Sequence, residues 1–419
     1  MLRSMNLRLT GFKRFVNATS QNLHGHFLRT TLIVTLIVLF GGACAPQQPI
    51  VQLRHPWRLE RVIESPTPVD RPALWADEST HLLLWAGEPT MPNIRLLLPT
   101  QETPIALPLG IRPRRLSIYP LPDGWYQLLW LDQTLPDQAF LVGGTLNAAF
   151  EVHRGPTEIA RGSVLEYVAV TSPDGMVVAF WTILEQGEPR LYGMRIDSLG
   201  RPRSPILIAE TARFPAAAFD QAGDLRLVWA EPGAGRIWTV RSVKMLGGAL
   251  ESAPALYPDQ IALIPLNTQQ TLEALTLALD STQAYLIWGL AQAGQGVSGR
   301  LEGMILAPDG RTTSIPLPQE TNLRLPAGPT GGRLAQGAIF TVLMSQNSAS
   351  PNAIGIITVR PNGGMELALI TPSPLPGVIG GVSAALLDSG KLRMGWSLLR
   401  PDGRTQLYEA VEGEAAAAP

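Results

Sequence analysis

The chain repeats a short run of mostly apolar residues that ends on an aromatic residue and is followed by a turn. Six copies end on Trp and one ends on Phe, and successive anchors lie 45 to 59 residues apart. A four-stranded propeller blade takes roughly 40–50 residues, so this spacing is typical of one blade per repeat with long loops. The anchors are Trp85, Trp130, Trp181, Trp229, Trp288, Phe340 and Trp396.

Each run predicts a strand that is buried on both faces. In the first copy, Leu83 and Trp85 point to one face and Leu82 and Leu84 to the other, because side chains alternate along a strand. A strand that is apolar on both faces must be covered on both faces, as it is between radially packed sheets. The sequence therefore predicts an all-β fold, a seven-bladed β-propeller of four-stranded antiparallel blades. Another all-β architecture, such as an array of β-sandwiches, is the alternative.

Turn signals divide the repeats into strands. Pro-Asp-Gly occurs at 122–124, 173–175 and 401–403, and Gly in such turns supplies the positive φ that a tight turn needs. The sixth repeat is degenerate, with Phe340 in place of Trp. The strands predicted for the first repeat are 72–76, 80–86, 93–98 and 103–108.

Two irregularities at the ends of the chain predict how the ring closes. The seventh repeat is one strand short, and residues 57–64 supply one strand before the first repeat. We expect strand 57–64 to pair with strand 406–411 and complete the last blade. This pairing would also hide two strand edges that otherwise promote aggregation.

The N-terminus has the pattern of an export signal. Residues 1–29 are basic and free of acids, and Thr30–Phe40 is an uncharged apolar run of 11 residues. That run is shorter than the roughly 20 residues of a membrane-spanning helix. The small residues before Cys44, the only cysteine, resemble the lipobox of bacterial lipoproteins, although Gly41 stands where that family usually has an aliphatic residue.

The lipobox resemblance implies that Cys44 carries a lipid and becomes the new N-terminus, which makes the membrane a partner. The alternative is an uncleaved signal anchor. Both interpretations place residues 45–419 outside the cytoplasm, on the outer face of the cytoplasmic membrane or on the outer membrane. The predicted organisation is a signal peptide over 1–43, a tether over 44–56, the propeller over 57–411 and a disordered tail over 412–419.

Composition excludes some functions. After Cys44 the chain has 28 basic and 34 acidic residues, a balance that argues against binding nucleic acid.

The five histidines have no metal-ligand spacing, and no phosphate loop or nucleophile elbow is present. The segment 222–229 resembles the Ser-x-Asp-x-Gly-x-x-Trp box of sialidase-type propellers only in part, without the leading Ser. The sequence therefore nominates no catalytic residue, no metal and no cofactor.

One set of residues suggests a binding site. Five arginines lie at or just before the predicted innermost strands, whose starts converge on one mouth of a propeller channel. Guanidinium groups gathered there would bind carboxylate, phosphate or sulfate. Glu158, Glu210 and Glu320 lie close by in sequence, so local ion pairs are the alternative. The arginines are Arg71, Arg115, Arg161, Arg213 and Arg324.

These observations predict a membrane-anchored binding or scaffolding module at the cell envelope. Its candidate partners are a glycan, an anionic small molecule or an envelope protein. The second hypothesis is a glycosidase or sialidase-like hydrolase with paired carboxylates at the mouth of the channel. A purely structural envelope component is the third. Because no carboxylate pair can be nominated from the sequence, binding is favoured over catalysis.

Overall fold

The computed structural model divides into two compact units, residues 1–50 and 51–419, and the described residues belong to the second. Cys44, the predicted signal peptide and nearly all of the predicted tether lie outside them. No helix among the described residues is long and apolar enough to cross a membrane. The described ranges are 53–54, 56–65, 68–86, 93–109, 113–135, 138–251, 257–292, 299–318, 322–326, 331–334, 336–346, 350–371 and 374–413.

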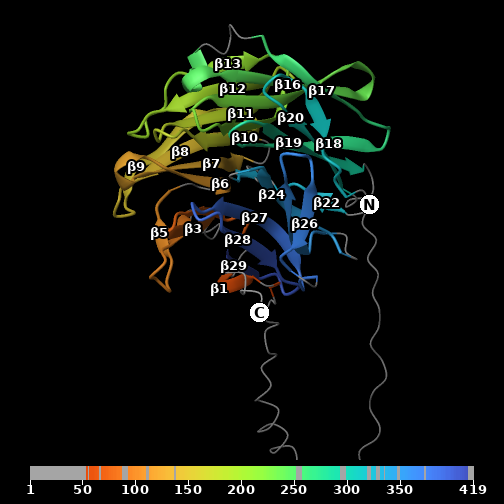
Figure 1. The fold of residues 1–419 in the computed structure, drawn as a ribbon. Helices are drawn as coiled ribbons and strands as arrows, with labels where there is room; N and C mark the ends of the chain where they lie inside the picture. The colour runs from red at the N-terminus through yellow and green to blue at the C-terminus, as the bar shows by residue number, and fades with distance from the viewer. Residues whose placement is uncertain are drawn as a thin grey trace, which may run out of the picture. The chain divides into compact units, whose positions relative to one another are not determined.

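The described residues form six sheets of mainly antiparallel strands, and three of these sheets are built from four strands that are consecutive in sequence (Figure 1). The first sheet follows the sequence prediction to within two residues at each strand end. Its strands are β2 (Ala73–Ala76), β3 (His81–Ala86), β4 (Ile94–Leu97) and β5 (Ile105–Leu107).

The second and third repeats are joined by one parallel bridge between Ser163 and Ala139, so hydrogen bonds link them into one eight-stranded sheet. The second repeat contains β6 (Pro113–Pro120), β7 (Tyr126–Leu135), β8 (Gln138–Leu146) and β9 (Val152–Ala160). The third contains β10 (Ser163–Thr171), β11 (Val177–Glu185), β12 (Glu188–Ile196) and β13 (Ile206–Ala209).

The fourth and fifth repeats are regular sheets of four strands. The fourth contains β14 (Arg213–Phe219), β15 (Leu225–Pro232), β16 (Ile237–Met245) and β17 (Asp259–Pro265). The fifth contains β18 (Gln270–Leu279), β19 (Ala284–Gln292), β20 (Gly299–Leu306) and β21 (Thr312–Ser314).

The sixth repeat is irregular, because two short strands take the place of the single inner strand of the other repeats. β22 and β23 pair with successive parts of β24. This is the repeat that the sequence marks by Phe340. Its strands are β22 (Leu323–Arg324), β23 (Gly331–Arg333), β24 (Ala338–Met344), β25 (Ala353–Val359) and β26 (Met365–Leu369).

The last sheet combines the two ends of the fold. It contains β27 (Val378–Leu386), β28 (Leu392–Leu399), β29 (Thr405–Glu412) and β1 (Trp57–Ser65). β1 pairs antiparallel with β29 from Trp57 opposite Glu412 to Ser65 opposite Thr405 (Figure 1). This is the pairing that the sequence predicts for strand 57–64. Since β29 includes Glu412, the ordered strand extends one residue beyond the predicted boundary at 411.

The aromatic anchors form the core, as predicted. All seven lie on the second strand of a repeat and are 0–7% exposed. They pack against neighbouring sheets as well as within their own: Trp130 of β7 packs with Leu82 and Leu84 of β3. In the last sheet Trp396 stacks on Tyr408, with ring centroids 5.2 Å apart. Both faces of each second strand are therefore covered.

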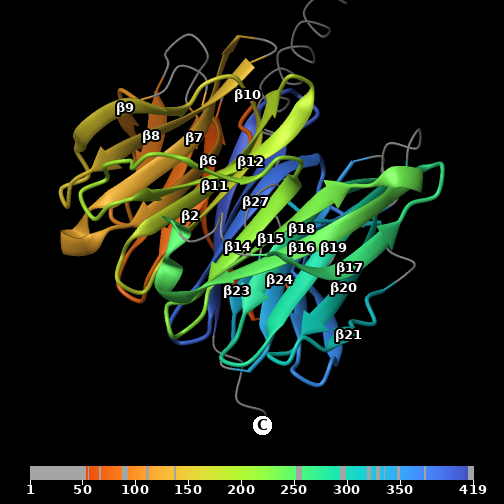
Figure 2. The same ribbon diagram turned by 90° about the horizontal axis from the view of Figure 1, so that it is seen from above.

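The inner strands of the repeats adjoin one another. β2 contacts both β6 and β27, and contacts continue from β6 through β10, β14, β18 and β23 to β27. Figure 2 shows the sheets spread outward, with β2, β14, β23 and β27 toward the middle. The inner strands thus bring residues from distant repeats into one region.

Candidate functional site

Most of the inner strands contain a β-bulge. Bulges bend a strand, redirect its side chains and are common beside active sites. At two of these bulges Arg115 and Phe214 have φ of 51° and 56°, a region that residues other than Gly rarely adopt. Such strain costs about 1–3 kcal/mol per residue and often accompanies function. The register shifts lie between Arg114 and Ser117, Val164 and Glu166, Arg213 and Ala216, Leu272 and Ala274, and Ile379 and Gly381.

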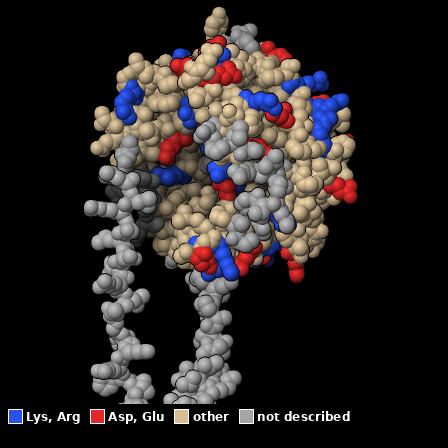
Figure 3. Space-filling view, turned by 180° about the vertical axis from the view of Figure 1, so that it is seen from behind, with Lys and Arg blue, Asp and Glu red and all other residues tan. Residues whose placement is uncertain are grey.

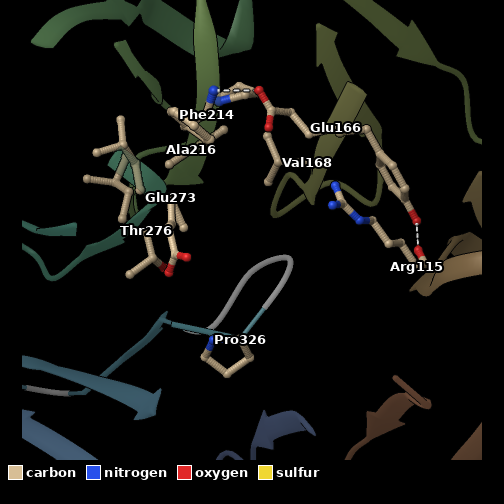
Figure 4. Close-up of a pocket in the computed structure, with 14 residues that line it drawn as sticks. Arg115, Glu166, Val168, Phe214, Ala216, Glu273, Thr276 and Pro326 are labelled. Atoms are coloured by element: carbon tan, nitrogen blue, oxygen red, sulfur yellow. Dashed lines mark hydrogen bonds between the residues drawn. The ribbon is translucent and has the colours of Figure 1, made fainter. Parts of the chain in front are cut away.

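Four of the bulged strands, β6, β10, β14 and β18, line a pocket together with Pro326. Its volume is about 100 Å³. Figure 4 shows Arg115 and Glu273 reaching toward the middle of the pocket from opposite sides, with Glu166 and Phe214 along another edge. This volume is below the roughly 300–1,000 Å³ of a drug-sized site, so the pocket suits one small group rather than a whole oligosaccharide.

Glu166 of β10 is the most firmly held carboxylate of the pocket. It accepts hydrogen bonds from the Arg213 Nε at 2.9 Å, the Phe214 backbone N–H at 2.7 Å and the Thr182 hydroxyl at 2.9 Å. Its side chain is 13% exposed. Three donors, one of them a guanidinium, hold this carboxyl in one orientation. Glu166 is therefore a fixed hydrogen-bond acceptor at the pocket edge.

Glu273 is the second carboxylate, and it lies in the bulge of β18. Its nearest ion-pair partner among the described residues is Arg324, with 4.0 Å between the Arg324 guanidinium and the Glu273 carboxylate. The Glu273 side chain is 38% exposed, so water reaches it. The two carboxylates therefore differ in environment: Glu166 is bound by protein donors, whereas Glu273 is accessible.

A buried tyrosine lies behind the pocket. The Tyr167 hydroxyl is within hydrogen-bond distance of the Ser117 hydroxyl at 2.8 Å and donates to the backbone carbonyls of Leu129, at 3.0 Å, and Arg115. Burial raises the pKa of Tyr167 far above its usual range, and nearby Tyr119 acts in the same direction. Tyr167 is therefore a neutral hydroxyl that fixes the bulge at Arg115, and it is unsuited to act as a base.

A second guanidinium is buried near Arg115. The Arg71 Nε donates to the Ser383 hydroxyl at 2.9 Å, across the junction between the first and last repeats. Burial lowers the pKa of Arg71, and the positive charge of Arg115 acts in the same direction. Tyr167, Tyr119 and Asp70 act in the opposite direction, so Arg115 makes only a minor contribution to the pKa of Arg71.

The five predicted arginines do not form a uniform ring. Arg115 lines the pocket, Arg213 pairs with the pocket residue Glu166, and Arg324 approaches Glu273. Arg161 forms a bidentate pair with Glu158 and is 77% exposed, as the ion-pair alternative predicted.

Of the glutamates predicted to neutralise these arginines, Glu158 pairs with Arg161 and Glu210 does not pair with any of the five. Glu210 pairs with Arg190 at 3.1 Å rather than with a pocket arginine. Glu320 lies outside the described residues. Of the five arginines, the pocket lining includes Arg115, and the anion-binding role of the set stays a prediction.

Glu166 and Glu273 were missed by sequence reasoning. Each is the single charged residue of a mostly apolar inner strand. An acidic residue within an inner strand is the sequence signal for these two positions. It can be recognised only when the repeats are aligned on their inner strands.

One other cluster has metal-binding residue types. Single ligand atoms of Glu60, His81 and Glu409 lie within 4.8 Å of one another. The Arg393 guanidinium donates to Glu409 at 2.9 Å and also bonds Glu60, while Arg61 lies 3.9 Å from Glu409. Because guanidinium groups already balance both carboxylates, this arrangement does not fit a divalent metal. We interpret it as a structural ion network between the first and last repeats.

Comparison with known proteins shows the fold. Neither a protein-family model nor a curated protein matches this chain. Among solved structures, polysaccharide lyase Uly1 is similar with a TM-score of 0.58 and 9% identity, covering 85% of this chain and 100% of its own. A PL25 ulvan lyase has a TM-score of 0.53 and 8% identity, covering 80% and 93%, and has also been solved bound to GlcA(1-4)Rha3S.

A protein of unknown function from Dyadobacter fermentans is also similar, with a TM-score of 0.50 and 9% identity over 86% of this chain and 100% of its own. Identities this low establish shared architecture and nothing about activity. The chain is an all-β protein with a propeller-like fold of four-stranded antiparallel sheets.

Proposed function

We propose that the seven repeats form a closed ring and that the pocket opens at one mouth of its channel. Three observations support closure. β27 of the last repeat contacts β2 of the first. Leu83 and Trp85 of β3 share a core cluster with Leu407 of β29. The pairing of β1 with β29 joins the two ends of the fold in one sheet.

We further propose that the protein is a polysaccharide-cleaving enzyme of the glycoside hydrolase kind. The observation that carries this proposal is the pair of carboxylates, Glu166 and Glu273, on different inner strands of one pocket. A pair of carboxyl groups flanking the scissile bond is the usual apparatus of glycoside hydrolysis. The fold shared with polysaccharide lyases supports a glycan as the ligand.

The environments of the two carboxylates suggest their roles. Glu166, oriented by three donors, would act as nucleophile or as the base that activates water. Glu273, the more accessible carboxyl, would donate a proton to the glycosidic oxygen. The bond between the anomeric carbon and that oxygen then breaks as the hydroxyl of a water adds to the anomeric carbon and the water proton passes to Glu166. If Glu166 instead attacks first, water displaces it from the anomeric carbon in a second step and the water proton returns to Glu273.

A second candidate, a glycan-binding module without catalysis, is favoured by one observation. Glu166 already accepts three hydrogen bonds, and these reduce its availability as a nucleophile. The same pocket would then hold a sugar without cleaving it. The two candidates differ in products and not in the place of binding.

The experiment is an assay of new reducing ends with the full-length protein on neutral and acidic polysaccharides. We expect Glu166→Gln and Glu273→Gln each to lower activity by about 10²–10⁴-fold. Glu158→Gln, a substitution in an exposed pair with Arg161, serves as the control and should retain activity. Binding without new reducing ends supports the second candidate. Products with unsaturated ends, or full activity in both pocket variants, contradict the carboxylate mechanism.

We also propose that the protein is exported and attached to the membrane through a lipid on Cys44. The basic leader, the apolar run and the small residues before this cysteine support the proposal. An enzyme placed there would meet polysaccharides outside the cytoplasm.

A further inference from the structure

Arg115 differs from the other arginines at the pocket in its partners. Arg213 pairs with Glu166 at 2.9 Å and Arg324 lies 4.0 Å from Glu273. The Arg115 guanidinium donates instead to the neutral backbone carbonyl of Leu165 at 3.2 Å. Among the described residues, no carboxylate lies within ion-pair distance of Arg115. Its charge at the pocket therefore has no protein counter-ion in that part of the chain.

The backbone directs Arg115 toward the pocket. The bulge between Arg114 and Ser117 gives Arg115 a φ of 51°, and Tyr167 holds the Arg115 carbonyl by a hydrogen bond. Figure 4 shows the side chain extending into the middle of the pocket, opposite Glu273. An arginine fixed in a strained conformation by a buried tyrosine is positioned more precisely than a surface arginine.

Arg71 is a second cation near this point. It is buried, and Asp70 partly balances its charge. Arg115 itself has no carboxylate at ion-pair distance among the described residues, so it favours a ligand that carries negative charge.

The attraction is local rather than a property of the whole surface. Figure 3 shows basic and acidic side chains interspersed on the face that it draws, without an extended area of one sign among the described residues. The chain after Cys44 has more acidic than basic residues. An anionic ligand would therefore be selected by contact with Arg115 and not by long-range steering.

We infer that Arg115 binds a carboxylate or sulfate group on one sugar of the substrate, so that the substrate class is an acidic polysaccharide. This inference rests on the function proposed above. Guanidinium binds both anions through two parallel hydrogen bonds, and the volume of about 100 Å³ suits a group of that size. Arg115 is thus the residue that determines specificity, while Glu166 and Glu273 perform the chemistry.

Matched polysaccharides test the inference with the full-length protein. Titration calorimetry measures the dissociation constant for each member of two pairs. Dextran sulfate is compared with dextran, and pectate with fully methyl-esterified pectin. We expect at least one acidic member to bind about tenfold or more tighter than its neutral counterpart, because a hydrogen bond to a charged group contributes a factor of that size. The pair that shows the preference distinguishes sulfate from carboxylate.

Variants identify the residue responsible. Arg115→Gln should abolish the preference for the acidic member, and Arg161→Gln, from the exposed pair with Glu158, should retain it. Arg115→Gly is the folding control, because Gly adopts positive φ without strain, so its melting temperature should match or exceed that of the wild type while the preference is lost.

The outcomes separate the two proposals. If the wild type binds and cleaves only neutral polysaccharides, the proposed function stands and this inference is wrong. The inference is also wrong if both Arg115 variants keep the full preference for the acidic member. If no polysaccharide is bound or cleaved, the proposed function fails and this inference fails with it.

Discussion

Replacement of Glu409 by Ala tests the junction between the first and last repeats. The Glu409 side chain is 0% exposed and accepts from Arg393 at 2.9 Å. His81 of β3 lies 3.0 Å away and Arg61 of β1 lies 3.9 Å away. One carboxylate therefore joins β1, β28 and β29 to the first repeat, and its removal leaves Arg393 buried without that partner.

Breaking a buried ion pair from one side costs about 3–5 kcal/mol when the remaining charge is left unpaired. Arg393 keeps Glu60 as a partner, so this range is an upper limit here. The unfolding entropy is about 2.1 cal/mol/K per residue, or roughly 0.78 kcal/mol/K over the roughly 370 residues of the unit 51–419. Dividing this cost by the entropy gives a fall in melting temperature of at most about 4–6 °C. This is the expected result for Glu409→Ala at neutral pH.

The effect should depend on pH. Burial opposes ionisation of Glu409, but the hydrogen bond with His81 and the attraction of Arg393 outweigh it and hold the pKa of this carboxyl below its usual range. A carboxyl with a depressed folded pKa stabilises the fold above its unfolded pKa, about 4.3 for Glu, and loses that contribution as pH falls through the folded pKa. The difference between wild type and Glu409→Ala should therefore shrink in acid.

Scanning calorimetry of both proteins between neutral and acid pH measures the effect. Glu158→Ala is the matched control, since its ion pair with Arg161 is exposed and such pairs contribute little. The reasoning is refuted if Glu409→Ala melts no lower than Glu158→Ala at neutral pH. It is also refuted if the deficit of Glu409→Ala persists unchanged below the folded pKa.

Two further predictions concern other parts of the chain. Phe340→Trp restores the repeat pattern but places a larger ring at a position that is 0% exposed, so it should destabilise the fold by about 1–3 kcal/mol in denaturant unfolding. An unchanged or raised midpoint would show that the sixth repeat has room for Trp. Cys44→Ser should abolish incorporation of labelled fatty acid and release the protein from membranes, and continued labelling would place the lipid elsewhere.

The anchors and strands could be predicted because burial on both faces constrains the sequence directly. Trp85, Trp130 and their equivalents must be apolar wherever a strand lies between two sheets, so the repeat remains visible. The pairing of β1 with β29 was predictable from a count of strands. The division of the sixth inner strand into β22 and β23 was not, because short Gly-containing segments carry little periodic signal.

The site was less predictable because it depends on register and on contacts between repeats. A bulge is defined by the partner strand, so the positions of Arg115, Phe214 and Glu273 do not follow from spacing alone. Arg161 lies just before an inner strand and Arg213 at the start of one, yet Arg161 pairs three residues away while Arg213 reaches Glu166 on a neighbouring repeat. Only the packing of repeats distinguishes these two outcomes.

Hydrogen exchange with and without an acidic oligosaccharide tests the central claim, that the inner-strand pocket is the glycan site. We expect slower exchange in four segments that line the pocket, around 113–117, 163–168, 213–217 and 270–277. Arg115→Gln should remove this protection, whereas Arg161→Gln should preserve it. Protection confined to the outer strands, with these four segments unchanged, would contradict the account.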